Sequence, residues 1–449
     1  MPDPSVRVVY LSPGAGGMYC GSCLSDNMLV RALRRLGADV TLVPLYTPLK
    51  TEEPDQSISQ VFFGGLSVYL RQALPWGDRL PGVLSQWLDQ PGLLKLLSRR
   101  AVRTDARRLG ALTLSMVRGE HGRQRAEVAR LVEWLKTQPR PDVINLGNFL
   151  VAGCVPMLKR ELGVPVVATL QGDDLFLDDL PPMFRADVEA ELRRIARIVD
   201  GFIVHSRYYA EEMGRRLAIP AERMHVVPLG IGVDALAMSA MSNAKRAFSR
   251  EISKLNASPP TVGFLARICP AKGLHFLIDG FLVLRSMPGM ERARLHVAGW
   301  IGPDDELYLR QQQQRLWDAG IDDAFELHRA PAFEEKRSFL QGIHVLSVPT
   351  TYREPKGRYV LEALAAGVPV VEPRHGAFSE MLARTGGGEL FEPGNATALA
   401  VALHGLLSDP RRRSELGEQG RRGVLSHHTD EHAARATLAV YRRFQTSPA

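Results

Sequence analysis

The chain lacks several features that would place it outside the soluble globular proteins. No stretch of 18 apolar residues occurs in its 449 residues, so no membrane-spanning helix is expected. Only four cysteines are present, too few for a disulfide framework in a chain of this length, and a reducing cytoplasm is the expected setting. No repeat of solenoid period is found, and the one biased tract is the short run Gln311–Gln314.

The overall composition indicates an ordinary globular protein. Hydrophobic residues make up 45% and charged residues 23%, so intrinsic disorder is excluded as the general state. The length implies at least two domains. The first residues, MPDPSVRVVYLSP, carry an acid and prolines and then a strand, so no signal peptide is expected.

Short β-branched strands alternate with amphipathic helices, which predicts a parallel sheet in each half of the chain. A first strand over 6–11 runs into the glycine loop Ser12–Gly17, and a helix over 24–36 follows. A glycine loop at this place lets the backbone approach a phosphate or sugar closely. The loop is not G-x-G-x-x-G, so a dinucleotide site is not indicated.

The predicted domain boundaries lie where the alternation of strands and helices stops and resumes. The first domain is expected over 1–234, with an insertion over about 46–137 that contains two basic helical stretches. A small, polar linker covers 235–259, and a second α/β domain covers 260–427. A last helix lies within 428–449.

The most informative stretch is HVLSVPTTYREPKGRYVLEALAAGVPVVE, from His344 to Glu372. Its pattern predicts a strand, a polar loop, a helix from about Gly357 to Ala366 and a second strand. Two carboxylates, Glu354 and Glu362, lie eight residues apart around the start of that helix. The free amides of a helix N-terminus can hold a diphosphate, and carboxylates can hold sugar hydroxyls.

A second motif about 80 residues earlier carries the complementary charge. Arg267 and Lys272 follow the strand predicted over 261–265. Cleavage of a sugar–phosphate bond leaves negative charge on the departing diphosphate, and fixed cations stabilise that charge as it develops.

Together these motifs resemble the retaining GT-B glycosyltransferases, especially glycosyltransferase family 4. The resemblance rests on E-x7-E followed by A-L-A-x-G-x-P-V-V, on R-x4-K-G, on the TLQGDD and VVPLGIGVD segments, and on GGGELFEPGN. It implies two Rossmann-like parallel-sheet domains facing across a cleft, with the C-terminal helix crossing back to the first domain. It implies retaining transfer from a nucleotide-sugar donor, expected to be UDP-linked, to an acceptor handled by the first domain, such as a lipid or cell-envelope glycan. No metal and no other cofactor are expected.

The resemblance also assigns residues. Arg267 and Lys272 would hold the diphosphate, helped by Gly16 and Gly17 and by the backbone amides around Gly357, Arg358 and Tyr359. Glu354 would bind the sugar hydroxyls and Glu362 the ribose.

The chain departs from the family pattern in two places. Gln171 stands where the family has a histidine beside the donor sugar; an amide can hydrogen-bond a hydroxyl but does not titrate near neutral pH. In the E-x-F-G-L loop, Lys356 replaces Phe and Arg358 replaces Leu, which adds positive charge near the phosphates.

Three further features each have more than one possible interpretation. Cys20 and Cys23 at a helix start are either a redox pair or small loop residues. Asp173 and Asp174 are expected in a loop after the strand predicted over 164–170, where they are either metal ligands or, as expected, caps or polar contacts. The segment from Lys95 to Arg130 contains ten Lys or Arg residues and three acidic residues. It is either a solvent-exposed face or a surface that binds an anionic membrane or a phosphorylated acceptor. No nucleic-acid motif accompanies it.

Two rival functions remain open at this point. One is another nucleotide-sugar enzyme on the same fold, an epimerase or a phosphorylase. The other is a non-catalytic, membrane-associated scaffold that keeps the fold alone; Arg267, Lys272, Glu354 and Glu362 argue against it.

Overall fold

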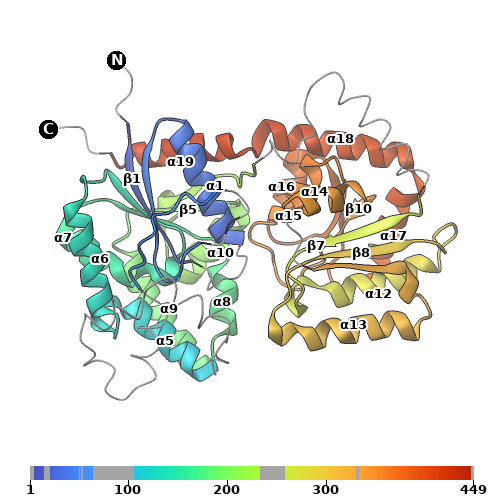
Figure 1. The fold of residues 1–449 in the computed structure, drawn as a ribbon, viewed down its shortest axis with the longest axis horizontal. Coiled ribbons are helices and arrows are strands. Elements are labelled where there is room, and N and C mark those ends of the chain that lie inside the picture. Colours follow the sequence, from blue (N-terminus) through green and yellow to red (C-terminus); the bar gives the residue numbers. More distant parts are fainter. Residues whose placement is uncertain are drawn as a thin grey trace. The chain divides into compact units, whose positions relative to one another are not determined.

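The structure is a computed structural model, and it describes residues 5–14, 21–49, 51, 54–63, 106–232, 258–329 and 333–445. The chain divides into two compact units (Figure 1). The first comprises 1–228 and 431–449, and the second comprises 229–430. Within the second unit, Ile231 pairs with Thr429, and the Ile231 amide donates to the His428 carbonyl.

The first unit contains a six-stranded parallel sheet in the order β2-β1-β3-β4-β5-β6. Its strands are β1 (Arg7–Ser12), β2 (Asp39–Pro44), β3 (Val143–Leu146), β4 (Val166–Thr169), β5 (Gly201–Val204) and β6 (Met224–Val226). Its α-helices are α1 (Gly21–Arg35), α5 (Ala106–Arg118), α6 (Arg125–Thr137), α7 (Val155–Leu162), α8 (Asp173–Asp179), α9 (Pro182–Ala196), α10 (Arg207–Leu217) and α19 (Asp430–Arg442).

This sheet is buried on both faces, and the side chains of β1 point alternately into the two cores. Val8 and Tyr10 belong to a core with α1, whereas Val9 and Leu11 belong to a core with α6, α7, α9 and α10. Burial on both faces explains why the strands are near-continuous apolar runs. The last helix, α19, contributes Leu438 and Tyr441 to the α1 side, so the C-terminal helix does return to the first unit as expected.

The second unit contains another six-stranded parallel sheet, in the order β12-β11-β10-β7-β8-β9. Its strands are β7 (Thr261–Leu265), β8 (Arg294–Gly299), β9 (Phe325–Arg329), β10 (Val345–Leu346), β11 (Val370–Pro373) and β12 (Gly388–Phe391). Its α-helices are α12 (Leu274–Arg285), α13 (Glu306–Asp318), α14 (Phe333–Gln341), α15 (Arg358–Ala365), α16 (Phe378–Thr385), α17 (Ala396–Ser408) and α18 (Pro410–His427).

The two parallel sheets confirm the predicted fold class. Among the described residues, no helix is both long and apolar enough to cross a bilayer. One local interpretation needs correction. Asp173 and Asp174 do not lie in a loop but form the first turn of α8, where Gly172 precedes them with a positive φ of 102°.

Candidate active site

In the second unit the order of the strands reverses between β7 and β10. The chain proceeds from β7 to β8 and β9 on one side, and from β10 to β11 and β12 on the other. Ligands of open α/β sheets bind beyond the carboxyl ends of the strands at such a reversal. Lys272 follows β7 and Glu354 follows β10, so the two predicted motifs meet at this point.

Two glycines allow the loops to approach closely enough. Gly273 has a φ of +76°, and a Cβ there would lie 1.9 Å from the carbonyl oxygen of Pro349. Gly376 has a φ of +57°, and its Cβ would lie 2.6 Å from the backbone nitrogen of Glu354. A side chain at either position would conflict both with the φ angle and with the neighbouring backbone.

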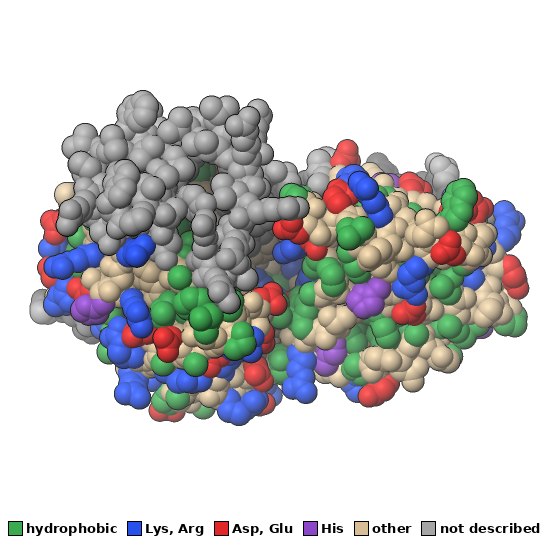
Figure 2. Space-filling model, turned by 90° about the horizontal axis from the view of Figure 1, so that it is seen from below, with side chains coloured by type: hydrophobic (Ala, Val, Ile, Leu, Met, Phe, Trp, Pro, Cys, Tyr) green, Lys and Arg blue, Asp and Glu red, His purple; other side chains and the backbone are tan. Residues whose placement is uncertain are grey.

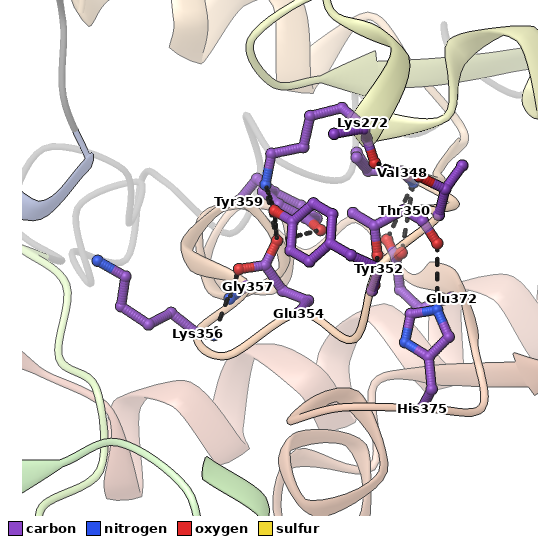
Figure 3. Close-up of polar contacts among 12 residues, drawn as sticks. Lys272, Val348, Thr350, Tyr352, Glu354, Lys356, Gly357, Tyr359, Glu372 and His375 are labelled. Atoms are coloured by element: carbon purple, nitrogen blue, oxygen red, sulfur yellow. Dashed lines mark hydrogen bonds and ion pairs between the residues drawn. The ribbon is translucent and has the colours of Figure 1, made fainter. Parts of the chain in front are cut away.

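Figure 3 shows the cluster that these loops form around the Glu354 carboxylate. The Lys272 ammonium lies 2.7 Å from Oε2 of Glu354 and also donates to the Tyr352 hydroxyl. The hydroxyl of Tyr352 donates to the same Oε2 at 2.7 Å, and that of Tyr359 does so at 3.4 Å. The ammonium also lies about 5 Å from the centres of both tyrosine rings, within the range of a cation–π contact.

The other oxygen, Oε1 of Glu354, accepts from the backbone amides of Lys356 at 3.3 Å and Gly357 at 3.2 Å. The side chain of Lys356 points away from the carboxylate (Figure 3). A carboxylate accepts about four hydrogen bonds. Glu354 is therefore fully engaged by Lys272, two tyrosine hydroxyls and two backbone amides.

Glu354 remains ionised despite its burial. Removal from water alone would raise its pKa, but the charge of Lys272 and the hydrogen bonds from Lys272, Tyr352 and Gly357 hold the pKa down at about 2. The pair is thus a fixed cation and a fixed anion at the end of two adjacent strands.

The second carboxylate of the motif has its own cations. Glu362, on the buried face of α15, accepts at Oε1 from Arg358 at 2.9 Å and from Lys336 of α14 at 3.4 Å. Burial raises its pKa, but the two positive charges outweigh burial and lower it. Both of these hydrogen bonds go to Oε1 of Glu362 and not to its Oε2.

Arg267 does not join the Lys272 cluster. Its guanidinium donates to Asp305 at 3.1 Å and lies 5.6 Å from the centre of the Trp300 ring. The Arg267 side chain is 56% exposed. Its predicted contact with a diphosphate requires a change of rotamer or release from Asp305.

Two buried groups beside this cluster escaped the sequence analysis. Glu372, at the end of β11, is fully buried and accepts from the Val348 amide at 3.2 Å. Burial, with the charge of Glu354 adding to it, raises its pKa well above the usual value. His375 shares a hydrogen bond with the Thr350 carbonyl through Nε2 at 3.1 Å, and its buried Nδ1 has no partner among the described residues.

In the first unit, a polar cluster lies at the reversal between β1 and β3. Asp26 of α1 is 1% exposed and accepts from Tyr10 and Ser12, each at 2.8 Å. Gln171, which follows β4, donates from its amide nitrogen to Asp26 and to the Gly147 carbonyl, again each at 2.8 Å. Gln171 is thus held in a fixed orientation. Asp26 was missed, although an acid in the buried stretch of α1 is a sequence signal.

The two aspartates after β4 form polar contacts, as expected. Asp173 accepts from the backbone amides of Phe149 and Gln171, each at 2.9 Å. Asp174 accepts from the Tyr209 hydroxyl at 2.7 Å, and burial raises its pKa to about 6. Both carboxylates serve to hold the loop that carries Gln171.

Several predicted residues cannot be placed. Gly16, Gly17 and Cys20 lie outside the described residues, as do Arg99, Arg100 and Arg103 of the basic segment. Cys23 is buried and makes no disulfide among the described residues. On the face in Figure 2, the Lys and Arg side chains of the described first unit alternate with acidic ones. Arg118, at the end of the described part of the basic segment's first helix, forms an ion pair with Asp187 at 3.9 Å.

Comparison with known proteins agrees with this geometry. The model of glycosyl transferases group 1 matches residues 245–423, and the model of Glycosyltransferase Family 4 matches residues 95–235. Together they include the site residues Gln171, Arg267, Lys272, Glu354 and Glu362.

Individual relatives are glycosyltransferases. The chain is 29% identical to a D-inositol 3-phosphate glycosyltransferase of Xylanimonas cellulosilytica over 71% of this chain and 74% of the relative. It is 28% identical to a GDP-mannose-dependent alpha-(1-6)-phosphatidylinositol monomannoside mannosyltransferase of Mycolicibacterium smegmatis, over 60% and 68%. Among solved structures, Anabaena HepE in complex with UDP superposes with a TM-score of 0.66, at 15% identity, over 98% of this chain and 100% of that one.

The family models and the named relatives indicate a sugar-transferring enzyme, and the fold consists of two Rossmann-like units. The chain is a GT-B glycosyltransferase similar to family 4.

Proposed function

We propose that this glycosyltransferase takes a sugar from a UDP-linked donor and transfers it, with retention of anomeric configuration, to a hydroxyl group of a lipid or cell-envelope glycan. The observation that carries the proposal is the Lys272–Glu354 pair at the strand-order reversal of the second unit. It supplies a cation for the diphosphate and a carboxylate for the sugar within 2.7 Å of each other.

The chemistry assigned to Lys272 follows from charge. When the bond between the anomeric carbon and the phosphate oxygen breaks, the electron pair stays on that oxygen. A fixed ammonium beside it lowers the energy of the developing charge more than that of the intact donor, which is the condition for catalysis. Arg267 is proposed to add a second cation after leaving Asp305.

Glu362 is proposed to bind the ribose through its Oε2. Arg358 and Lys336 keep this carboxylate ionised, and they bring two further positive charges to the start of α15. The backbone amides of Gly357 and Tyr359 are proposed to complete the phosphate contacts. The Gly357 amide already donates to Glu354, so a phosphate there would share or replace that bond.

The donor base and the acceptor are proposed from the relatives. The HepE structure holds UDP, whereas the Mycolicibacterium relative is named for GDP-mannose. That relative is also named for a phosphatidylinositol mannoside, which supports a lipid-linked acceptor. The basic segment 95–130 is proposed to bring the enzyme to an anionic membrane surface that presents such an acceptor.

The test is a transfer assay with radiolabelled UDP-sugars and GDP-mannose, each with and without membrane lipid extract. The proposal predicts a labelled lipid product from a UDP-linked donor, with the anomeric configuration of the donor by NMR, and only slow hydrolysis without acceptor. A changed sugar on the nucleotide without acceptor would indicate an epimerase. Transfer from GDP-mannose alone would contradict the assigned base, and no binding of any donor would favour the scaffold.

The membrane contact is tested separately by co-sedimentation with anionic vesicles. Binding should weaken with added salt, because exposed charges are screened over about 10 Å at 0.1 M. Charge reversal of Arg99, Arg100 and Arg103 should abolish it. Sedimentation that is absent, or unchanged in the variant, leaves a solvated basic face.

A further inference from the structure

A group of three metal-binding side chains lies on the second unit, away from the Lys272–Glu354 pair. His296 of β8, with Glu326 and His328 of β9, places one ligand atom each within 4.8 Å of the others. In the sheet order β10-β7-β8-β9, β9 is three strands from β10, which is roughly 14 Å at the usual strand spacing.

The register of the sheet brings these three side chains together. His296 is directly beside Glu326 in the parallel pairing, and Ala298 is beside His328. Glu326 and His328 are two residues apart, so their side chains point to the same face of β9. Three ligands from two paired strands form a rigid arrangement, because the backbone hydrogen bonds of the sheet hold them.

The distances suit a small divalent ion. Nε2 of His296 lies 3.4 Å from Oε2 of Glu326, and Nε2 of His328 lies 3.1 Å from Oε1. Ligand atoms about 2.0–2.2 Å from a tetrahedral zinc ion are themselves roughly 3.3 Å apart. Nε2 of His296 is shielded from solvent and makes no hydrogen bond among the described residues, so a metal ion would give this buried nitrogen a partner.

The surroundings provide access and support. The three residues line a cavity of about 590 Å³ together with Glu335, Ser338 and Phe339 of α14. Glu326 is 52% exposed, so an ion can enter from solvent. The ring of His328 packs edge-on against Phe339 at 5.5 Å, which fixes its orientation.

The nearby charges are balanced. Arg329 lines the same cavity but is paired with both carboxylate oxygens of Glu306.

We propose that His296, Glu326 and His328 form a binding site for a borderline transition-metal ion of the Zn²⁺ class, with its remaining coordination position open to the cavity. Two imidazoles and a carboxylate are a ligand set that suits zinc and its neighbours, and not magnesium or calcium. The ion would join the edge strand β9 to β8. Since α14 covers the cavity and also carries Lys336, the ion would be one helix away from Glu362.

The test uses the full chain without a histidine tag. Zn²⁺ is titrated by calorimetry, and Co²⁺ is added as a probe with a visible absorption spectrum. We expect one saturable ion per chain and a low-coordinate Co²⁺ spectrum. His328→Ala and Glu326→Gln should each weaken Zn²⁺ binding by about 100-fold, since each removes one of three protein ligands.

The control is His427→Ala, which removes an exposed histidine of the same unit and should leave Zn²⁺ binding unchanged. Glu326 is half exposed, so Glu326→Gln should fold even if His296→Ala does not; far-UV circular dichroism checks this. Absence of saturable binding by the unaltered chain overturns the proposal. So does binding that is unchanged in both Glu326→Gln and His328→Ala.

Discussion

At the scale of single residues, two buried glutamates of the second unit have opposite pKa shifts. Lys272 and the hydrogen bonds around Glu354 hold its pKa at about 2, below the ordinary 4.5, despite burial. Glu372 lacks a cation of its own, so burial raises its pKa. The first group is therefore an anion at neutral pH, and the second is a neutral acid at mildly acidic pH.

This difference predicts that a Glu→Gln substitution changes the free energy of unfolding very differently at the two positions. Glu354→Gln leaves Lys272 buried without its counter-charge and should reduce the free energy of unfolding by about 3 kcal/mol. Glu372→Gln keeps an acceptor for the Val348 amide and should change that free energy by less than about 1 kcal/mol, or increase it at pH 8. Urea denaturation of both variants checks this; equal losses would contradict the assigned charge states.

The pH dependence of stability follows with a definite sign. Stabilisation by Glu354 is fully present above pH 4.5 and is lost as pH falls towards its folded pKa of about 2. Stabilisation by protonated Glu372 is present below pH 4.5 and is lost as pH rises through its raised pKa. Subtracting the unfolding curves of the two Gln variants from that of the unaltered chain should therefore give slopes of opposite sign.

A substitution at Glu354 should affect sugar transfer without affecting the binding of free UDP. Glu354→Gln should cut turnover, because the group proposed to position the reacting sugar is altered. Its affinity for free UDP should stay nearly unchanged, since UDP carries no sugar at that position. A loss of UDP affinity as large as that of Lys272→Ala would show that the Glu354–Lys272 pair acts as one diphosphate-binding unit.

At the scale of elements, the loop between β7 and α12 depends on one glycine. Gly273→Ala forces a Cβ to within 1.9 Å of the Pro349 carbonyl and should displace Lys272 from Glu354. Gly289 is a matched control, because it has a φ of +78° but nothing within 4 Å of a Cβ. Gly289→Ala should cost only about 1 kcal/mol, the strain of the φ angle alone.

The measurement for this pair is thermal unfolding together with UDP affinity. Gly273→Ala should lose both stability and UDP binding, while Gly289→Ala should keep UDP binding. If both variants lose stability equally and bind UDP normally, close approach of the two loops is not what positions Lys272.

The sequence predicted the bounds of helices and strands well, but it did not predict the contacts between them. The strand Thr261–Leu265 was predicted with the observed bounds, and the E-x7-E helix within a residue or two, because apolar periodicity and glycine stops are local signals. The partner of Glu362 was not predicted. Lys336 reaches it from α14, a contact created by the packing of α14 and α15, which no spacing along the chain encodes.

The family resemblance assigns one role to Arg267 and Lys272, and in the structure the two side chains make different contacts. Lys272 lies in the loop that Gly273 brings against β10, so it meets Glu354. Arg267 lies five residues earlier, beside Trp300 and Asp305, which follow β8. A shared motif therefore does not by itself fix a shared set of contacts.

At the scale of the whole molecule, the last helix belongs to the first unit although the second unit precedes it in the chain. Leu438 and Tyr441 of α19 complete the core on the α1 side of the first sheet. Truncation after Asp430 should therefore expose that core. Hydrogen exchange should show lost protection in β1 and α1, with β7 and β10 unaffected; equal loss in both sheets would contradict independent units.

Tyr441 supplies a milder variant for the same interface. Its hydroxyl is buried and has no hydrogen-bond partner among the described residues. Tyr441→Phe should leave stability unchanged or raise it by up to about 1 kcal/mol, whereas Tyr441→Ala should cost about 3–5 kcal/mol through the cavity left behind. Chemical denaturation of the two variants checks this. A loss of stability in Tyr441→Phe would show that the hydroxyl has a polar role beyond the packing of the ring.

The account depends above all on Lys272 as the cation of the donor diphosphate, and calorimetry with UDP tests this directly. Lys272→Ala should weaken UDP binding by about 10- to 100-fold, the loss expected for one charged hydrogen bond. Lys159→Ala removes an equally close lysine–carboxylate pair in the first unit, 2.6 Å from Asp200, and should bind UDP like the unaltered chain. Unchanged UDP affinity in a folded Lys272→Ala variant would contradict the central claim.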